Sequence, residues 1–160
     1  MKQLLILFLT LSVFNLSAQD AREKEVMKVI DQLFEAMRTN DSTLLKSCFA
    51  ENASSYTLFK DPAGTSQLRQ GSVQRFADAV GQPKSDVWNE PIWNEKVHID
   101  GPLAAVWVDY AFYLNNQFLH CGVDAFQLIE TEEGWKIFHL ADTRRKSDCV
   151  IPDEVKAKFE

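Results

Sequence analysis

The sequence is short of the residues on which several kinds of protein depend. Its 160 residues include only three cysteines, six glycines and five prolines, and acidic residues outnumber basic ones, which gives a formal net charge of −6. Proteins that bind nucleic acid, or an anionic membrane surface, need clustered lysine and arginine side chains. The composition therefore argues against nucleic acid as a partner, and against a membrane as a partner of the mature chain.

Signature motifs of several enzyme classes are missing as well. The sequence has no glycine-rich phosphate-binding loop and no nucleophile motif. Two histidines and two aspartates in its C-terminal half are chemically able to bind zinc, but their spacing matches no zinc motif. We therefore expect neither a metal ion nor a cofactor.

The cysteines Cys48, Cys121 and Cys149 cannot all pair within one chain. Their spacing matches no metal motif, and we expect them to be buried as small apolar residues. The alternative is a single disulfide with one spare thiol, for which Cys48–Cys149 is one arrangement.

The N-terminus has the plan of a secretory signal peptide. A lysine precedes an apolar run from Leu4 to Leu16, and small residues end at Ala18, before a polar segment. The run is shorter than the roughly 18 residues of a membrane span, although an uncleaved anchor is the alternative. We expect residues 1–18 to be a signal peptide that directs a bacterial protein to the periplasm or the medium.

The remaining residues, 19–160, have the length of one domain. Helical spacing of apolar residues predicts a first helix that begins near Asp20. A second, shorter helix starts at Asp41 or Ser42, and a third runs from Ser72 to Gly81. The apolar residues of the first helix are Val26, Val29, Ile30, Leu33, Phe34 and Met37.

A four-stranded antiparallel meander follows the helices, which predicts an α+β fold with helices on one face of the sheet. Asn115 and Asn116 form a two-residue hairpin turn in this prediction, so Ala111 lies opposite His120. Opposed residues share a face of the sheet, and a bulge would move part of the set to the other face. The set predicted to share one face contains Trp107, Asp109, Tyr113, His120, Asp124, Phe126, Trp135 and His139.

An apolar surface that holds a few convergent ionisable groups is typical of a ligand pocket. The sequence thus predicts a cavity for a small, partly aromatic or polar organic molecule. Its apolar walls are Trp107, Tyr113, Phe126 and Trp135, and its polar groups are Asp109, His120, Asp124 and His139. One alternative is an isomerase, dehydratase or cyclase in which Asp109 and His120 transfer a proton. In another, these polar residues only satisfy one another and the protein is an inert interaction module.

The other face of the predicted sheet is also apolar, which three helices cannot fully cover. This face is therefore a candidate homodimer interface. Its residues are Val106, Val108, Tyr110, Phe112, Leu119, Val123, Phe138 and Leu140.

The chain resembles the nuclear transport factor 2-like superfamily, in particular its SnoaL-like and "putative lumazine-binding" branches. The resemblance rests on the first helix with Phe34 and Met37, on the turn from Asn40 to Leu44, on VDYAFYLNNQFLHCGVDAFQLI and on the terminal Gly134–Ile137 strand. It implies a cystatin-like cone, in which three N-terminal helices pack on a strongly curved antiparallel sheet around a cavity. It also implies dimers formed through the outer sheet face and, in the family's enzymes, proton transfer by Asp, Tyr or His in the cavity.

Overall fold

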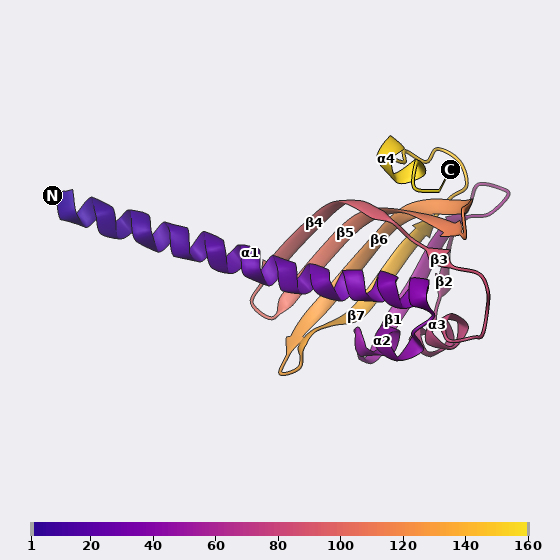
Figure 1. Ribbon diagram of the computed structural model, residues 1–160, viewed down its shortest axis with the longest axis horizontal. Coiled ribbons are helices and arrows are strands. Elements are labelled where there is room, and N and C mark those ends of the chain that lie inside the picture. Colours follow the sequence, from indigo (N-terminus) through magenta and orange to yellow (C-terminus); the bar gives the residue numbers. More distant parts are fainter. Residues whose placement is uncertain (1, 160) are drawn as a thin grey trace.

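The computed structural model describes residues 2–159, with side chains from residue 19 onward. Its helices are α1 (Lys2–Thr39), α2 (Ser42–Ser47), α3 (Val73–Val80) and α4 (Asp153–Lys156). Its strands are β1 (Phe49–Lys60), β2 (Ser66–Gln70), β3 (Trp88–Asn89), β4 (Ile92–Asp100), β5 (Leu103–Leu114), β6 (Gln117–Thr131) and β7 (Gly134–Arg144). Figure 1 shows α1 lying across one face of the sheet, with α2 and α3 near its C-terminal end.

Local sequence signals explain where the helices end. Asn40 adopts a positive φ of 58°, which breaks α1. The Asp41 carboxylate then accepts hydrogen bonds from the backbone N–H groups of Thr43 and Leu44, so it is the N-cap of α2. Ser72 caps α3 in the same way and Gly81 ends it, as predicted. The predicted start of the first helix at Asp20 is wrong, because α1 is continuous through this position.

The signal-peptide prediction falls on residues whose side chains lie outside the described part of the chain. It is therefore left as a prediction. Within the described part, no helix is both long enough and apolar enough to cross a membrane.

The predicted meander is present as β4, β5, β6 and β7, but the sheet is larger and mixed. Its strand order is β2-β1-β7-β6-β5-β3, and β4 also pairs with β5. β1 pairs with β7 in parallel, so the prediction of a wholly antiparallel sheet is wrong. The segment after residue 50, which has weak periodicity, forms the hairpin of β1 and β2, and therefore separates α2 from α3.

The helical layer and the curvature also differ from the prediction. α2 is only six residues long, so α1 and α3 are the substantial helices of the layer. The strands lie side by side as a twisted sheet and do not curl strongly into a cone (Figure 1). The α+β, cystatin-like class is retained with these corrections.

The core lies between α1 and the inner face of the sheet. The apolar side of α1, with Ile30 and Leu33, is buried against Val106, Val108 and Phe126. Both Val106 and Val108 are almost fully buried. The prediction that these two valines belong to an exposed dimer face is therefore wrong, because β5 turns its even-numbered residues inward.

A C-terminal segment covers part of the outer sheet face. Cys121 on β6 and Cys149 form a disulfide, and Cys48 is a buried free thiol. Phe159 stacks on Tyr113, with ring centroids 4.0 Å apart and 11° between the ring planes. The prediction of three unpaired cysteines is therefore wrong, and so is the alternative Cys48–Cys149 pairing. The Cys121 side chain points outward from β6, toward the C-terminal segment that contains Cys149.

Candidate functional site: a cavity between the first helix and the sheet

A cavity of about 640 Å³ lies between α1, α3, the 81–91 segment and the inner face of the sheet. Its aromatic lining includes Phe34, Phe76, Trp88, Phe112 and Phe126. Ionisable side chains enter the same space from the sheet and from the 81–91 segment. The volume falls within the range of pockets that enclose a small organic ligand.

A bulge in β6 decides which residues reach this cavity. Near the hairpin Tyr113 pairs with Phe118, but the next pair is Phe112 with His120, so Leu119 is the extra residue. The predicted pairing of Ala111 with His120 is therefore wrong by one residue. Because side chains alternate along a strand, this shift changes the face on which His120 meets β5.

The bulge divides the predicted site residues between the two faces. His120, Asp124 and Phe126 line the cavity together. Trp135 is buried in the same core but does not line the cavity. Trp107, Asp109 and Tyr113 are on the outer face, so Asp109 and His120 do not form the predicted catalytic pair.

A second bulge moves His139 to the outer face. Leu128 pairs with Ile137, and Gln127 pairs with His139, so Phe138 is the extra residue. His139 Nδ1 lies 2.8 Å from the Ser54 hydroxyl. The predicted pairing of His139 with Phe126 is wrong, because Phe126 pairs with Leu140.

Tyr110 determines the tautomer of His120. The Tyr110 hydroxyl donates to the carbonyl oxygen of Thr143 at 2.9 Å and lies 3.1 Å from His120 Nδ1. Since its one proton is used toward Thr143, Nδ1 must carry a proton and donate to the tyrosine oxygen. His120 Nε2 is then a hydrogen-bond acceptor on a ring that lines the cavity. Burial, together with the nearby Arg144 charge, lowers the pKa of His120 to about 4, so the ring is neutral at pH 7.

Asp142 and Arg144, which both line the cavity, form an ion pair. Arg144 Nε donates to Asp142 Oδ2 at 2.6 Å, and the Thr57 hydroxyl donates to Asp142 Oδ1 at 2.7 Å. The partners come from β7 and from β1, which is its parallel neighbour. Asp142 is thus held by two donors and is not available to a ligand without breaking this arrangement.

Two carboxyl groups share the remaining part of the wall. Asp124 is only 4% exposed, and its buried Oδ2 receives no hydrogen bond from any described donor. Its hydrogen-bonding neighbour is the Glu90 carboxyl, so one of the two groups must hold a proton. Burial raises the pKa of Glu90 to about 8 and raises that of Asp124 well above its usual value. This is a proton-holding pair of acids in a largely apolar cavity.

Sequence reasoning missed Glu90, Tyr110, Asp142 and Arg144. Leu140, Asp142 and Arg144 are two residues apart along β7, so they share a face of the strand. Extending the strand period beyond His139 would have indicated this. Tyr110 was assigned to the wrong face because the bulge was not placed. Glu90 lies in the irregular segment between β3 and β4, where no periodicity indicates burial.

Known proteins show the family and the fold of this chain. A sequence model of the family described as "Putative lumazine-binding" matches residues 21–140. The chain belongs to this family. It thereby belongs to the nuclear transport factor 2-like superfamily, and the cavity lies within the matched region except for Asp142 and Arg144. None of the curated proteins matches the chain.

Solved structures share the fold of this member of the "Putative lumazine-binding" family at low sequence identity. A protein of unknown function from Mycobacterium tuberculosis is 15% identical with a TM-score of 0.67, over 89% of this chain and 86% of its own. A "putative dehydratase" of the same superfamily from Streptomyces avermitilis is 14% identical with a TM-score of 0.63, over 81% and 99%. A nuclear transport factor 2-like protein with a cystatin-like fold from Novosphingobium aromaticivorans is 11% identical with a TM-score of 0.63, over 91% and 95%.

No metal centre is found in the described part of the chain. Within it, no group of three or more His, Cys, Asp or Glu side chains is arranged to hold an ion. The groups that the cavity presents to a ligand include its carboxyl pair, its neutral imidazole and its aromatic walls.

Proposed function

We propose that this protein binds a small organic molecule, partly aromatic and partly polar, in the cavity between α1 and the sheet. The observation that carries the proposal is the meeting of aromatic side chains with the acceptor groups of His120, Asp124 and Glu90 around one space of about 640 Å³. Pockets that bind small molecules combine such apolar walls with a few convergent polar groups. The name of the family also supports a small-molecule ligand.

A second candidate function is proton transfer by an isomerase, dehydratase or cyclase. It is favoured by the carboxyl pair, which holds a proton near neutral pH beside a neutral imidazole. The pair of residues that would act is Asp124 with His120, because Asp109 lies on the outer face. A dehydratase-named structural neighbour is consistent with this alternative.

Replacing Asp124→Asn is expected to reduce ligand retention to about one-tenth or less, because the buried carboxyl that faces the ligand beside Glu90 is replaced by an amide. The measurement is native mass spectrometry of protein purified from its own host, compared with the same protein after denaturation. The matched control is Asp109→Asn, which makes the same change on the outer face, where Asp109 accepts a hydrogen bond from Asn94. Asp109→Asn should retain as much ligand as the unaltered protein.

Equal retention by both variants would refute the cavity assignment. The proton-transfer function predicts a larger effect of the same Asp124→Asn replacement. If a substrate is identified, Asp124→Asn should lower its turnover by about a hundredfold or more, whereas a receptor has no turnover to lose.

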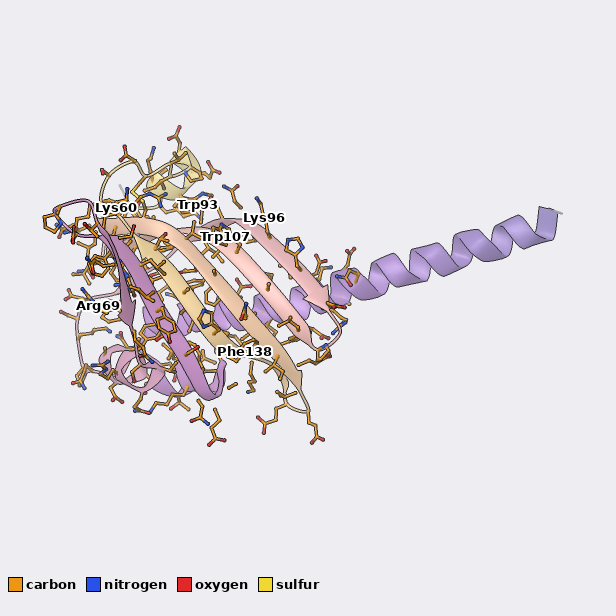
Figure 2. All side chains as sticks on the ribbon, turned by 180° about the vertical axis from the view of Figure 1, so that it is seen from behind. Lys60, Arg69, Trp93, Lys96, Trp107 and Phe138 are labelled. Carbon is orange, nitrogen blue, oxygen red and sulfur yellow. A yellow bond between two sulfur atoms is a disulfide. The ribbon has the colours of Figure 1, made fainter. Side chains whose placement is uncertain are left out.

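We also propose that the protein forms a homodimer through the outer sheet face. Figure 2 shows Trp93, Lys96, Trp107 and Phe138 on the face turned away from α1. Trp107 is 52% exposed and stands between two hollows. One hollow is lined by Lys96, His98, Gln127 and His139, and the other by Asn94, Glu95, Lys96 and Asp109.

This arrangement is self-complementary under a two-fold axis, which places the same patch of both copies face to face. An exposed indole can enter a hollow of the second copy, and the basic side of one patch can meet the acidic side of the other. The proposed interface therefore uses the odd-numbered residues of β5, in place of the even-numbered residues predicted from the sequence.

Trp107→Glu is expected to weaken the dimer at least about tenfold, because it places a charge at the centre of the proposed interface. Sedimentation velocity over a micromolar concentration series measures the change. Leu68→Glu is the control, since Leu68 is 65% exposed on β2, at the opposite edge of the sheet from β3. An unaltered protein that stays monomeric at these concentrations would exclude the dimer.

Export of the chain after cleavage at Ala18 is also a proposal. The Cys121–Cys149 disulfide supports it, because structural disulfides persist in oxidising compartments. A mature protein that begins at Gln19 is the observation that would test it.

A further inference from the structure

The polar lining of the cavity contains more acids than bases. Four carboxyl side chains line it, those of Asp86, Glu90, Asp124 and Asp142. The basic groups are Lys84 and Arg144. The cavity therefore has an acidic excess, which matters for a ligand only if the basic groups are already occupied.

Both basic groups are occupied. Arg144 is paired with Asp142 at 2.6 Å. Lys84 Nζ donates to the carbonyl oxygens of Ala79 at 3.2 Å and Val80 at 3.3 Å. It also lies 3.5 Å from the centroid of the Trp88 ring.

Two hydroxyl groups of the cavity also donate their protons to acceptors within the protein. The Thr57 hydroxyl donates to Asp142, and the Tyr110 hydroxyl donates to the carbonyl oxygen of Thr143. By contrast, His120 Nε2 is an acceptor, and Asp124 Oδ2 has no donor among the described residues. The Ser55 and Ser72 hydroxyls also line the cavity, but no described donor reaches Asp124 Oδ2, so the Asp124–Glu90 end of the lining has an acceptor without a donor.

We propose that the ligand is an organic cation, a protonated amine with an aromatic or apolar body, whose ammonium group binds at the Asp124–Glu90 pair. This inference rests on the proposed ligand-binding function and specifies its ligand class. An ammonium group brings N–H donors and a positive charge, which are what the pair lacks. The aromatic rings of Phe34, Phe112 and Phe126 face the same space and suit the body of such a ligand. Carboxylate and phosphate ligands would find no free cationic partner there, because Lys84 and Arg144 are both occupied.

Binding exchanges one charge for another. When the ammonium group binds, the proton held between the two carboxyls leaves for the solvent, and no bond between heavy atoms forms or breaks. The other ionisable groups around the pair are Asp142 and Arg144 from β7, Tyr110 from β5 and His120 from β6. α1 contributes only Leu33, Phe34 and Met37 to this lining, but Glu90 also borders a neighbouring hollow that Asp31, Glu35 and Arg38 of α1 line.

The sign of the pH dependence follows from this exchange. Burial raises the pKa of Glu90 to about 8, so the proton competes with the ligand below that pH. The affinity for an amine that stays protonated over this range should therefore rise with pH, by about tenfold per unit where one full proton is released, and level off above about pH 8. A neutral ligand should show no such rise.

Isothermal titration calorimetry of the full chain with paired probes tests the inference. The probes are aryl-alkyl amines from benzylamine to 2-(1-naphthyl)ethylamine, each with the alcohol of the same carbon skeleton. Titrations near pH 6 and near pH 7, in buffers of different ionisation enthalpy, report both the affinity and the number of protons released. We expect an amine to bind at least about tenfold more tightly than its alcohol and to release close to one proton.

Replacements at the two carboxyls test whether the amine binds at the Asp124–Glu90 pair. Asp124→Asn and Glu90→Gln should each abolish proton release and remove the preference for the amine, while the alcohol binds as before. Circular dichroism confirms that each variant folds, and the pair of variants keeps the test valid if one does not. Asp109→Asn should bind both probes like the unaltered protein.

The outcomes separate this inference from the proposed function. If the alcohols bind as tightly as the amines, or if amine binding releases no proton, the cation inference is wrong while the cavity remains a ligand site. If no member of either series binds, the cation inference is refuted. If, in addition, the purified protein retains no molecule, the ligand-binding function fails with it.

Discussion

Gly122→Ala is expected to destabilise the protein by about 3 kcal/mol or more and to disorganise the cavity. A Cβ atom at Gly122 would overlap the carbonyl oxygen of Thr143 and would lie 2.8 Å from Tyr110 Cε1. The obstacle is mainly backbone, which cannot rotate away as a side chain can. β6 and β7 would have to separate where Thr143 accepts the Tyr110 hydroxyl, so His120 would lose the group that orients it.

Thermal and denaturant unfolding measure this effect, and a fall in melting temperature of roughly 10 °C is expected for a domain of this size. Gly71→Ala is the matched control. A Cβ there would meet the Ser55 hydroxyl, the far end of a flexible side chain that can turn aside. A stability change at Gly122 no larger than that at Gly71 would contradict the close approach of the two strands.

The double replacement Cys121→Ser and Cys149→Ser is expected to lower the free energy of unfolding by about 3.5 kcal/mol. The disulfide closes a segment with a sequence separation of 28, and its removal enlarges the conformational freedom of the unfolded chain. In the folded protein the same bond attaches the C-terminal segment to β6, where Phe159 stacks on Tyr113. Loss of the bond should therefore expose the outer face around Tyr113 to faster hydrogen exchange than the inner face.

Reduction of the unaltered protein should reproduce the stability of the double variant, and reduction of the double variant should change nothing further. Cys48 is the internal standard, because it is buried and burial raises the pKa of its thiol to about 11. Thiol titration in denaturant should find one free thiol before reduction and three after it. Three free thiols before reduction would show that the bridge does not form.

The helices illustrate what local sequence can predict. The signals that end α1, begin α2 and enclose α3 are short-range: a left-handed asparagine, an aspartate cap, a serine cap and a terminating glycine act within four residues of themselves. The apolar spacing of α1 was read correctly for the same reason, since Val26, Ile30 and Leu33 are all buried. The start at Asp20 failed because a capping residue can also lie inside a longer helix.

The candidate site illustrates where local sequence is insufficient. The hairpin turn at Asn115 was placed correctly, and Leu114 does pair with Gln117. One extra residue at position 119 then changed the face of everything beyond it, and a further extra residue at position 138 moved His139 outward. Bulges depend on the twist of the whole sheet and on what packs against it, so the alternation of residue types along one strand does not locate them.

The sequence by itself determined the family, the α+β class, the helix boundaries set by caps and the presence of His120, Asp124 and Phe126 on one strand face of β6. These properties follow from contacts within a few residues or from the period of a single strand. Only the tertiary structure decided that Glu90, Asp142 and Arg144 join them, that Asp109 and Trp107 face outward, and that Cys121 pairs with Cys149. Those outcomes depend on segments far apart in the chain, which meet through two bulges, one parallel strand pair and the irregular segment that carries Glu90.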